Sequence, residues 1–123
     1  MQTLQQQRAR YALEKVKAAV TKSTFESKAF KSQAESFPAM IRMNGLGPAA
    51  AFYLSKDGAH KRLYTILSDW LTQNHQPYEG KPLLEGITTG DSQQYRLAQA
   101  EALMLLDWIK RFAKALVTEE KSS

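Results

Sequence analysis

The chain has 123 residues, with 17 Lys and Arg, 12 Asp and Glu and no cysteine, which gives a formal net charge of +5 at pH 7. This length predicts one domain that buries its own core, and the lack of cysteine excludes disulfides and thiolate metal sites. No stretch approaches the roughly 20 apolar residues of a membrane span, and the Gln-rich start lacks the apolar core of a signal peptide. We therefore expect a cytoplasmic protein that makes no membrane contact.

The positive charge is concentrated near the start of the chain. Seven of the 17 Lys and Arg, but only two of the 12 Asp and Glu, lie within residues 1–31, and the remainder is balanced. A basic excess of this size is consistent with a polyanion as partner.

The first half of the chain predicts two long helices. Thr3 with Gln6, and Ser23 with Glu26, have the spacing of capping boxes, and apolar residues of helical period follow each of them. We expect helices over residues 4–22 and 24–44. Pro38 should kink or split the second helix, because its ring removes one backbone hydrogen bond.

A tight corner is predicted where the second helix ends. Asn44-Gly45 can supply a left-handed cap, and Gly47-Pro48 can start a new helix without needing an amide hydrogen. Residues 49–54 then form a short apolar helix, and residues 59–75 a further one. Residues 76–82 have the composition of a loop, and residues 83–87 form at most one turn.

The strongest helical pattern lies in the last quarter of the chain. Asp91 with Gln94 again has capping-box spacing, and residues 92–118 keep an apolar stripe of helical period without glycine or proline. Residues 118–123 should fray. Because no segment alternates apolar and polar residues as a strand does, the predicted fold is all-α: a compact bundle of about five to seven helices, one domain over residues 1–123, with no sheet.

No motif indicates an active site or a metal site. His60 and His75 are far apart in sequence, with no carboxylate at ligand spacing, so exposed helical histidines are expected. The glycines of residues 44–47 resemble a phosphate loop, but the Lys-Ser/Thr of a P-loop is missing and no strand precedes them. The acidic residues of the second half are predicted to be solvated or to cap helices: Asp69, Glu85, Asp91, Glu101 and Asp107. We expect no enzyme, no catalytic residue, no metal and no cofactor.

Basic residues fall into rows on the predicted helices. Arg8, Lys15 and Lys22 are seven residues apart and make one stripe, and Arg10 with Lys17 makes another. Such stripes can follow a phosphate backbone.

The last helix predicts a second basic face. Arg96 and Lys114 are in register, with Asp107, Lys110 and Arg111 within about 60° of them. The alternative is that Asp107 and Arg111 form an ordinary i,i+4 pair on a solvated surface. If the helix over residues 24–44 is continuous, Lys28, Lys31 and Arg42 also share a face, with Glu35 among them.

The aromatic residues favour a core over base stacking. Those on apolar stripes are Phe30, Phe37, Phe52, Trp70 and Phe112. Pattern alone thus indicates a small basic helical module that binds a nucleic-acid backbone or a partner protein.

A family resemblance narrows this interpretation. Four blocks in order carry it: residues 8–16 (RARYALEKV), residues 37–56 (FPAMIRMNGLG followed by AFYLSK), residues 67–71 (LSDWL) and residues 95–113 (YR, EAL and LDWIKRFA). Together they resemble the small helical subunit of the Cmr complex, the type III-B CRISPR effector. Residues 76–90 match only weakly, so no role is assigned to them.

The resemblance implies a non-catalytic, all-helical subunit that acts in antiviral defence. Several copies would stack into a filament against the backbone subunits that carry the CRISPR RNA (crRNA), and the groove between them would accommodate target RNA. The residues that match family blocks and are candidates for nucleic-acid contact are Lys15, Lys17, Arg42, Lys56, Arg96, Lys110 and Arg111. Candidates for contact with a neighbouring subunit are Met40, Met43 and Leu46, for which core packing is the alternative.

A free-standing helical DNA-binding or regulatory module is the competing hypothesis. A helix-turn-helix needs polar, base-reading side chains on its second helix. Residues 49–54, after the corner, offer almost none, which counts against this hypothesis.

Overall fold

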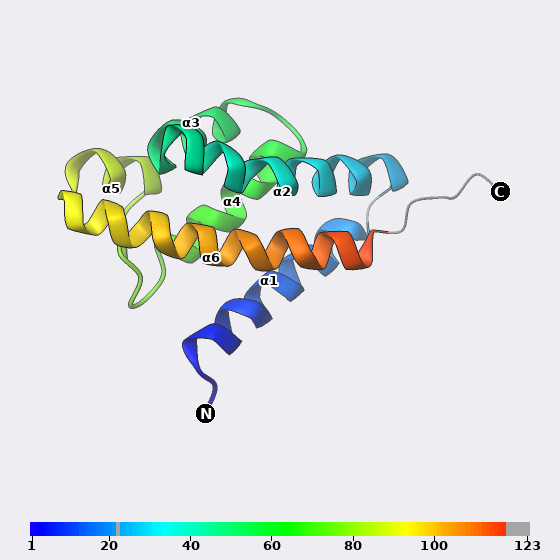
Figure 1. Ribbon diagram of the computed structural model, residues 1–123, viewed down its shortest axis with the longest axis horizontal. Coiled ribbons are helices and arrows are strands. Elements are labelled where there is room, and N and C mark those ends of the chain that lie inside the picture. The colour runs from blue at the N-terminus through cyan, green and yellow to red at the C-terminus, as the bar shows by residue number, and fades with distance from the viewer. Residues whose placement is uncertain (22, 118–123) are drawn as a thin grey trace.

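The computed structural model describes residues 1–21 and 23–117, and within them every regular element is an α-helix (Figure 1). The helices are α1 (Leu4–Val20), α2 (Thr24–Asn44), α3 (Leu46–Ser55), α4 (Ala59–Leu71), α5 (Leu83–Thr89) and α6 (Ser92–Leu116). The prediction of an all-α fold without a sheet is confirmed. The predicted tail, residues 118–123, lies outside the described residues, as does Lys22.

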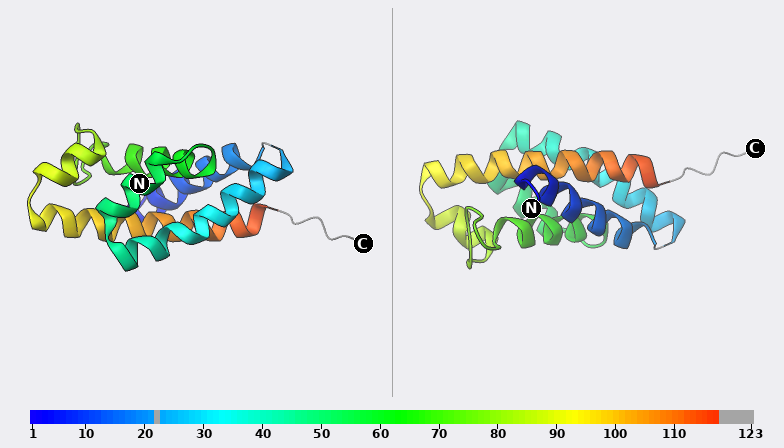
Figure 2. Two further views of the ribbon diagram at one scale, coloured as in Figure 1. Left: turned by 90° about the horizontal axis from the view of Figure 1, so that it is seen from above. Right: turned by 90° about the horizontal axis from the view of Figure 1, so that it is seen from below.

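The bundle is built around the two longest helices. α6 has 25 residues and α2 has 21, and they run in opposite directions along the long axis of the molecule (Figure 1). α1 crosses α6 at an angle and α4 lies on the far side of both, while α3 and α5 sit at the end where α6 begins (Figures 1 and 2). α6 therefore has one face on the core and one face outside.

The core takes the predicted apolar stripes from all six of these helices. Phe30, Phe37 and Trp70 are at most 4% exposed, as predicted. Phe52 is 39% exposed, so its predicted place in the core is wrong. Its ring lies beside α3 against His60, 5.9 Å between ring centroids, because Tyr53 fills the inward position and stacks on Phe37 at 3.8 Å.

Helix starts follow the predicted caps. The side chain of Thr3 accepts from the Gln6 amide and that of Asp91 from the Gln94 amide, each with the reciprocal bond of a full capping box. Ser23 accepts a hydrogen bond of 3.2 Å from the amide of Glu26. Local side-chain chemistry therefore sets these three boundaries.

Several predicted boundaries shift. α4 ends at Leu71 rather than at residue 75, because the Leu71 carbonyl accepts from the Tyr78 amide at 3.1 Å and the chain folds back. α5 is a helix of seven residues, and α3 begins at Leu46. Pro38 does not split α2, which continues to Asn44.

Candidate nucleic-acid interface

The corner between α2 and α3 is closed by α6. Gly45 ends α2, and its amide donates to the Ile41 carbonyl at 2.7 Å. Its φ of 91° is a positive backbone angle that glycine adopts readily and other residues rarely do. The next two amides point at α6: that of Leu46 donates to Gln99 Oε1 at 2.9 Å, and that of Gly47 to the Tyr95 hydroxyl at 2.8 Å.

These hydrogen bonds decide whether the glycine-rich corner can bind a phosphate. A helix N-terminus binds anions through free backbone N–H groups. At the start of α3 two of these donors are used by Tyr95 and Gln99, and Pro48 has none. The corner is a structural joint and not a phosphate cradle, as its sequence indicated.

The outer face of α6 carries the predicted basic row. Arg96, Lys110 and Arg111 are exposed, while the opposite side of the helix is buried along its length. At 1.5 Å per residue, Arg96 and Lys110 are about 21 Å apart along the axis. Arg111 Nε also donates to Asp107 Oδ2 at 3.0 Å, so the solvated i,i+4 pair offered as the alternative does form.

The candidates on α1 do not form one surface. Arg8, Ala12, Val16 and Ala19 face the core, so residues 15 and 17 fall on opposite flanks of the helix. Lys15 lies on the flank toward α4, with its Nζ 5.3 Å from the centre of the Tyr11 ring, whose hydroxyl donates to the Ile66 carbonyl. Lys17 is exposed on the other flank.

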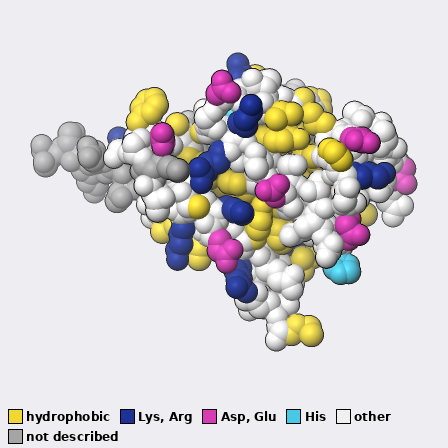
Figure 3. Space-filling view, turned by 180° about the vertical axis from the view of Figure 1, so that it is seen from behind, with side chains coloured by type: hydrophobic (Ala, Val, Ile, Leu, Met, Phe, Trp, Pro, Cys, Tyr) yellow, Lys and Arg dark blue, Asp and Glu magenta, His cyan; other side chains and the backbone are white. Residues whose placement is uncertain are grey.

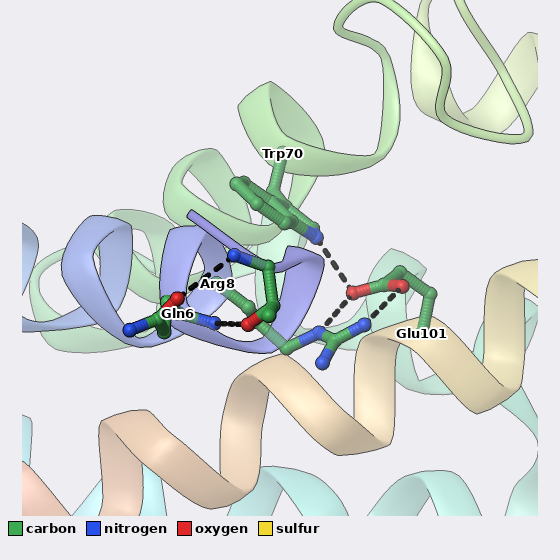
Figure 4. A network of polar contacts seen from close by, with 5 residues as sticks. Gln6, Arg8, Trp70 and Glu101 are labelled. Atoms are coloured by element: carbon green, nitrogen blue, oxygen red, sulfur yellow. Dashed lines mark hydrogen bonds and ion pairs between the residues drawn. The ribbon is translucent and has the colours of Figure 1, made fainter. Parts of the chain in front are cut away.

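Arg8 departs from the predicted stripe. It is 6% exposed, and its Nε and Nη2 donate to Glu101 Oε2 and Oε1 at 2.5 and 2.8 Å (Figure 4). Trp70 Nε1 donates to the same carboxylate at 2.9 Å. The hydrogen bond to Glu101 raises the pKa of Arg8 above its ordinary value. The predictions that Arg8 belongs to an exposed stripe and that Glu101 is solvated are wrong, because these side chains join α1, α4 and α6.

Arg42 and Lys56 lie on either side of the corner and are both exposed. Lys56 Nζ stands 5.2 Å from the centre of the exposed Phe52 ring. Because α2 is continuous, Arg42 shares a face with Lys28, Lys31 and the acidic Glu35, as predicted. This is a mixed face rather than a purely basic one.

The three predicted subunit-contact residues differ in exposure. Met43 is 81% exposed and Met40 is half-buried. Leu46 is fully buried, because it is the first residue of α3 and points into the core. For Leu46 the core-packing alternative is therefore correct, and only the two methionines can reach a neighbour.

The face that carries α1 and α4 holds basic residues that the sequence analysis did not select. Figure 3 shows dark-blue Lys and Arg side chains in a band across it, interrupted by acidic ones and bordered by apolar ones. Lys61 and Arg62 of α4 are exposed and partly exposed, and Lys61 pairs with Asp57 at 3.8 Å. Their spacing in the sequence gives no hint that they share a face with α1.

The two histidines lie at opposite ends of α4 and form no common site. His60 packs against Tyr53, 4.8 Å between ring centroids, and burial lowers its pKa. His75 lies beyond the end of α4, in a turn. Within residues 1–21 and 23–117 no three His, Asp or Glu side chains are close enough to hold a metal ion. In the same ranges no helix has the length and apolarity of a membrane span.

The fold and its surface define a small, basic, all-helical protein, most of whose described Lys and Arg side chains lie on its outer faces. The family model described as "CRISPR-associated protein (Cas_Cmr5)" matches residues 4–116. The chain belongs to this Cmr5 family, which confirms the resemblance found in its four sequence blocks.

A sequence match and a structural match, both to Thermus thermophilus, support the assignment. The chain is 31% identical over 90 residues to its "CRISPR system Cmr subunit Cmr5", an alignment that covers 73% of this chain and 76% of the relative. The crystal structure of a CRISPR-associated Cmr5 family protein from the same organism superimposes with a TM-score of 0.81 and 31% identity, covering 95% of this chain and 100% of that one.

Proposed function

We propose that this chain is a non-catalytic small subunit of a type III-B Cmr ribonucleoprotein complex and acts in antiviral defence in the cytoplasm. Several copies stack beside the backbone subunits and help to hold crRNA and target RNA. The observation that carries the RNA contact is the outer face of α6, where Arg96, Lys110 and Arg111 are exposed on an unbroken helix. The name of the Thermus relative supports membership of the complex.

Phosphate contact suits the chemistry of this face. Base pairing between guide and target already selects the sequence, so an accessory subunit needs only cations on a rigid support. α6 is such a support, because seven of its residues are buried against the other helices. Its exposed guanidinium and ammonium groups present charge without any fixed pattern of base-reading side chains.

Contact with a neighbouring subunit is assigned to exposed apolar side chains. Met43, at the end of α2, is 81% exposed, with the half-buried Met40 one turn before it. Large apolar side chains in such positions gain free energy when a partner covers them. Arg42, just before the corner, and Lys56, at the other end of α3, can contact either RNA or the backbone subunit.

Charge reversal on α6 tests the RNA contact. The double variant Lys110→Glu/Arg111→Glu should weaken capture of target RNA by the assembled complex at least tenfold at low salt, with a reduced salt slope, because two phosphate contacts become repulsive. The measurement is RNA retention at several salt concentrations. Unchanged capture would remove this face from the proposed groove.

A matched control is available on α4. Lys61→Glu/Arg62→Glu changes the net charge by the same amount on a different helix. We expect it to leave target capture nearly unchanged. Equal losses in both double variants would show a general charge effect and contradict a defined α6 interface.

Assembly and the absence of catalysis are tested separately. The tagged chain should recover the Cmr backbone subunit, and the purified chain should not cleave RNA with or without a divalent metal. Metal-dependent cleavage that is lost on a point substitution would overturn the non-catalytic assignment. Specific binding to duplex DNA without any other subunit would favour the alternative, a free-standing DNA-binding module.

A further inference from the structure

A polar groove lies between the first half of α1 and the end of α4. It has a volume of about 400 Å³ and is completed by the turn that follows α4, residues 73–76. A hydrogen bond from the Tyr11 hydroxyl to the Ile66 carbonyl links α1 to α4 here, and both helices are visible in the right-hand view of Figure 2. None of the candidate RNA-contact residues on α6 lines it. Its size falls within the range of about 300–1,000 Å³ that small-molecule clefts occupy.

Carboxamide side chains dominate its lining: Gln2, Gln7, Gln73, Asn74 and Gln76. Gln7 Nε2 donates to the Gln2 carbonyl at 3.2 Å. The amide groups of Gln73, Asn74 and Gln76 have no hydrogen-bond partner among the described residues. A carboxamide offers a donor and an acceptor side by side, which is the pattern that the edge of a nucleobase complements.

Two aromatic side chains also line the groove, and both are fixed in place. The Tyr11 hydroxyl donates to the Ile66 carbonyl at 2.7 Å, and Trp70 Nε1 donates to Glu101 at 2.9 Å. Their ring centroids are 4.9 Å apart. Trp70 is only 4% exposed and supports Tyr11 from the core side, so the partly exposed Tyr11 ring is the aromatic surface that the groove offers. Aromatic surface beside free amides is the combination by which proteins hold unstacked bases.

The charge of the groove favours a neutral ligand. Its lining contains one basic residue, Arg10, and one acidic residue, Glu14, besides His75. Arg10 Nε pairs with Glu14 Oε1 at 3.4 Å, so the two charges compensate each other. A phosphate or an acidic peptide would gain little from such a site. Lys15, over the Tyr11 ring, lies next to it and can receive the phosphate of a nucleotide whose base is inside.

The backbone at the rim is unusual. His75 lines the groove and has φ 69°, the left-handed region that side chains other than glycine rarely adopt. Its amide donates to Glu79 Oε1 at 2.6 Å, which holds the turn. Strained residues concentrate at binding sites, where the surrounding structure maintains them.

We propose that this groove receives one unpaired nucleobase of single-stranded RNA, with the carboxamides on its edge and Tyr11, supported by the buried Trp70, against its ring. The choice of RNA as the source of the base rests on the proposed function. The site would add to the phosphate contacts of α6 a contact that only an unstacked nucleotide can make.

Nucleoside titration of the full chain tests the groove without any other subunit. Adenosine and cytidine, which carry no phosphate, should shift the side-chain amide signals of Gln73, Asn74 and Gln76 in ¹H–¹⁵N spectra, whereas ribose alone should not. No shift with either nucleoside at millimolar concentration would overturn the proposal. Equal shifts with ribose would assign the groove to sugars and would also overturn it.

Substitutions on the exposed turn locate the contact. Gln73→Ala/Asn74→Ala should weaken nucleoside binding about five- to tenfold, because two hydrogen bonds to the base are lost. The matched control Gln5→Ala/Gln93→Ala removes two exposed amides elsewhere and should change nothing. Equal affinity of both double variants would contradict the proposal.

Oligonucleotides separate this inference from the proposed function. Gln73→Ala/Asn74→Ala should weaken the binding of base-bearing single-stranded RNA to the full chain, but not the binding of an abasic strand. Lys110→Glu/Arg111→Glu should weaken both. If nucleosides bind the groove while the chain fails to join the Cmr complex, the proposed function fails and the nucleobase site stands; the reverse result overturns only the site.

Discussion

Two arginine–carboxylate pairs on α6 have opposite surroundings. Glu101 and Asp107 are six residues apart on the same helix. The Arg8–Glu101 pair has side-chain exposures of 7% and 10%, and it joins α1 to α6. The Asp107–Arg111 pair has exposures of 51% and 71% and lies within one helix. The first pair connects elements of the fold, while the second remains on a surface that faces solvent.

The difference shows how burial changes what an ion pair does. An exposed i,i+4 pair is screened by water and stabilises by roughly 0.3–0.5 kcal/mol. A buried pair has lost its hydration, so each partner becomes indispensable to the other once both are inside. Glu101 accepts three hydrogen bonds from two helices. It therefore determines where α1 and α4 sit against α6.

Glu101→Ala should have the largest effect. It leaves the Arg8 guanidinium buried without a counter-ion and Trp70 Nε1 without an acceptor, so we expect a loss of about 3–5 kcal/mol in the free energy of unfolding. Urea denaturation followed by circular dichroism measures it. A loss below about 1 kcal/mol would show that Arg8 simply turns out to solvent.

A double variant sharpens this test. Arg8→Met/Glu101→Leu removes both charges and keeps apolar volume, so it should be less destabilising than Glu101→Ala alone. If the double variant is the less stable of the two, the ion pair itself and not the avoidance of an unpaired charge stabilises the bundle.

Trp70→Phe should have an intermediate effect. It removes one donor to Glu101 while Arg8 keeps its partner, and a hydrogen bond to a charged group contributes about 1.5–3 kcal/mol. We expect a loss of about 2 kcal/mol in the same denaturation experiment, with no change in helix content. In the Glu101→Ala background the same substitution should be less destabilising, because the acceptor is already gone and only the loss of buried indole volume remains.

Asp107→Ala should have the smallest effect. It breaks only the exposed pair, so the free energy of unfolding should fall by no more than about 0.5 kcal/mol, and less at high salt. Freeing Arg111 should also strengthen RNA capture slightly if α6 faces RNA. A loss comparable to that of Trp70→Phe would break the contrast between the two pairs.

The contrast also explains what the sequence could predict. The Asp107–Arg111 pair and the Thr3, Ser23 and Asp91 caps each depend on residues three or four apart, and all four were found from spacing. Arg8 and Glu101 are 93 residues apart. Nothing in either segment marks these charges as buried, since Arg8 belongs to the same predicted heptad row as Lys15 and Lys22.

Which side chains are exposed was predicted less well than where the helices begin and end. Phe52 is exposed instead of buried, and Leu46 takes the core position that was its stated alternative, because Tyr95 and Gln99 hold the N-terminal turn of α3 against α6 and so fix the rotation of the helix. Periodicity alone cannot set that rotation in a helix of ten residues with apolar side chains on most sides. The groove beside α4 was missed for a related reason, because its amides come from two distant segments.

The joint between α3 and α6 has a mechanical consequence. Since the Leu46 and Gly47 amides are bound to Gln99 and Tyr95, the corner and the first half of α6 move as one rigid piece. The backbone positions of Arg42, just before the corner, and Arg96, next to Tyr95, are therefore fixed relative to each other. A ligand that spans both meets a preorganised surface, so little of its binding energy is consumed in ordering the protein backbone.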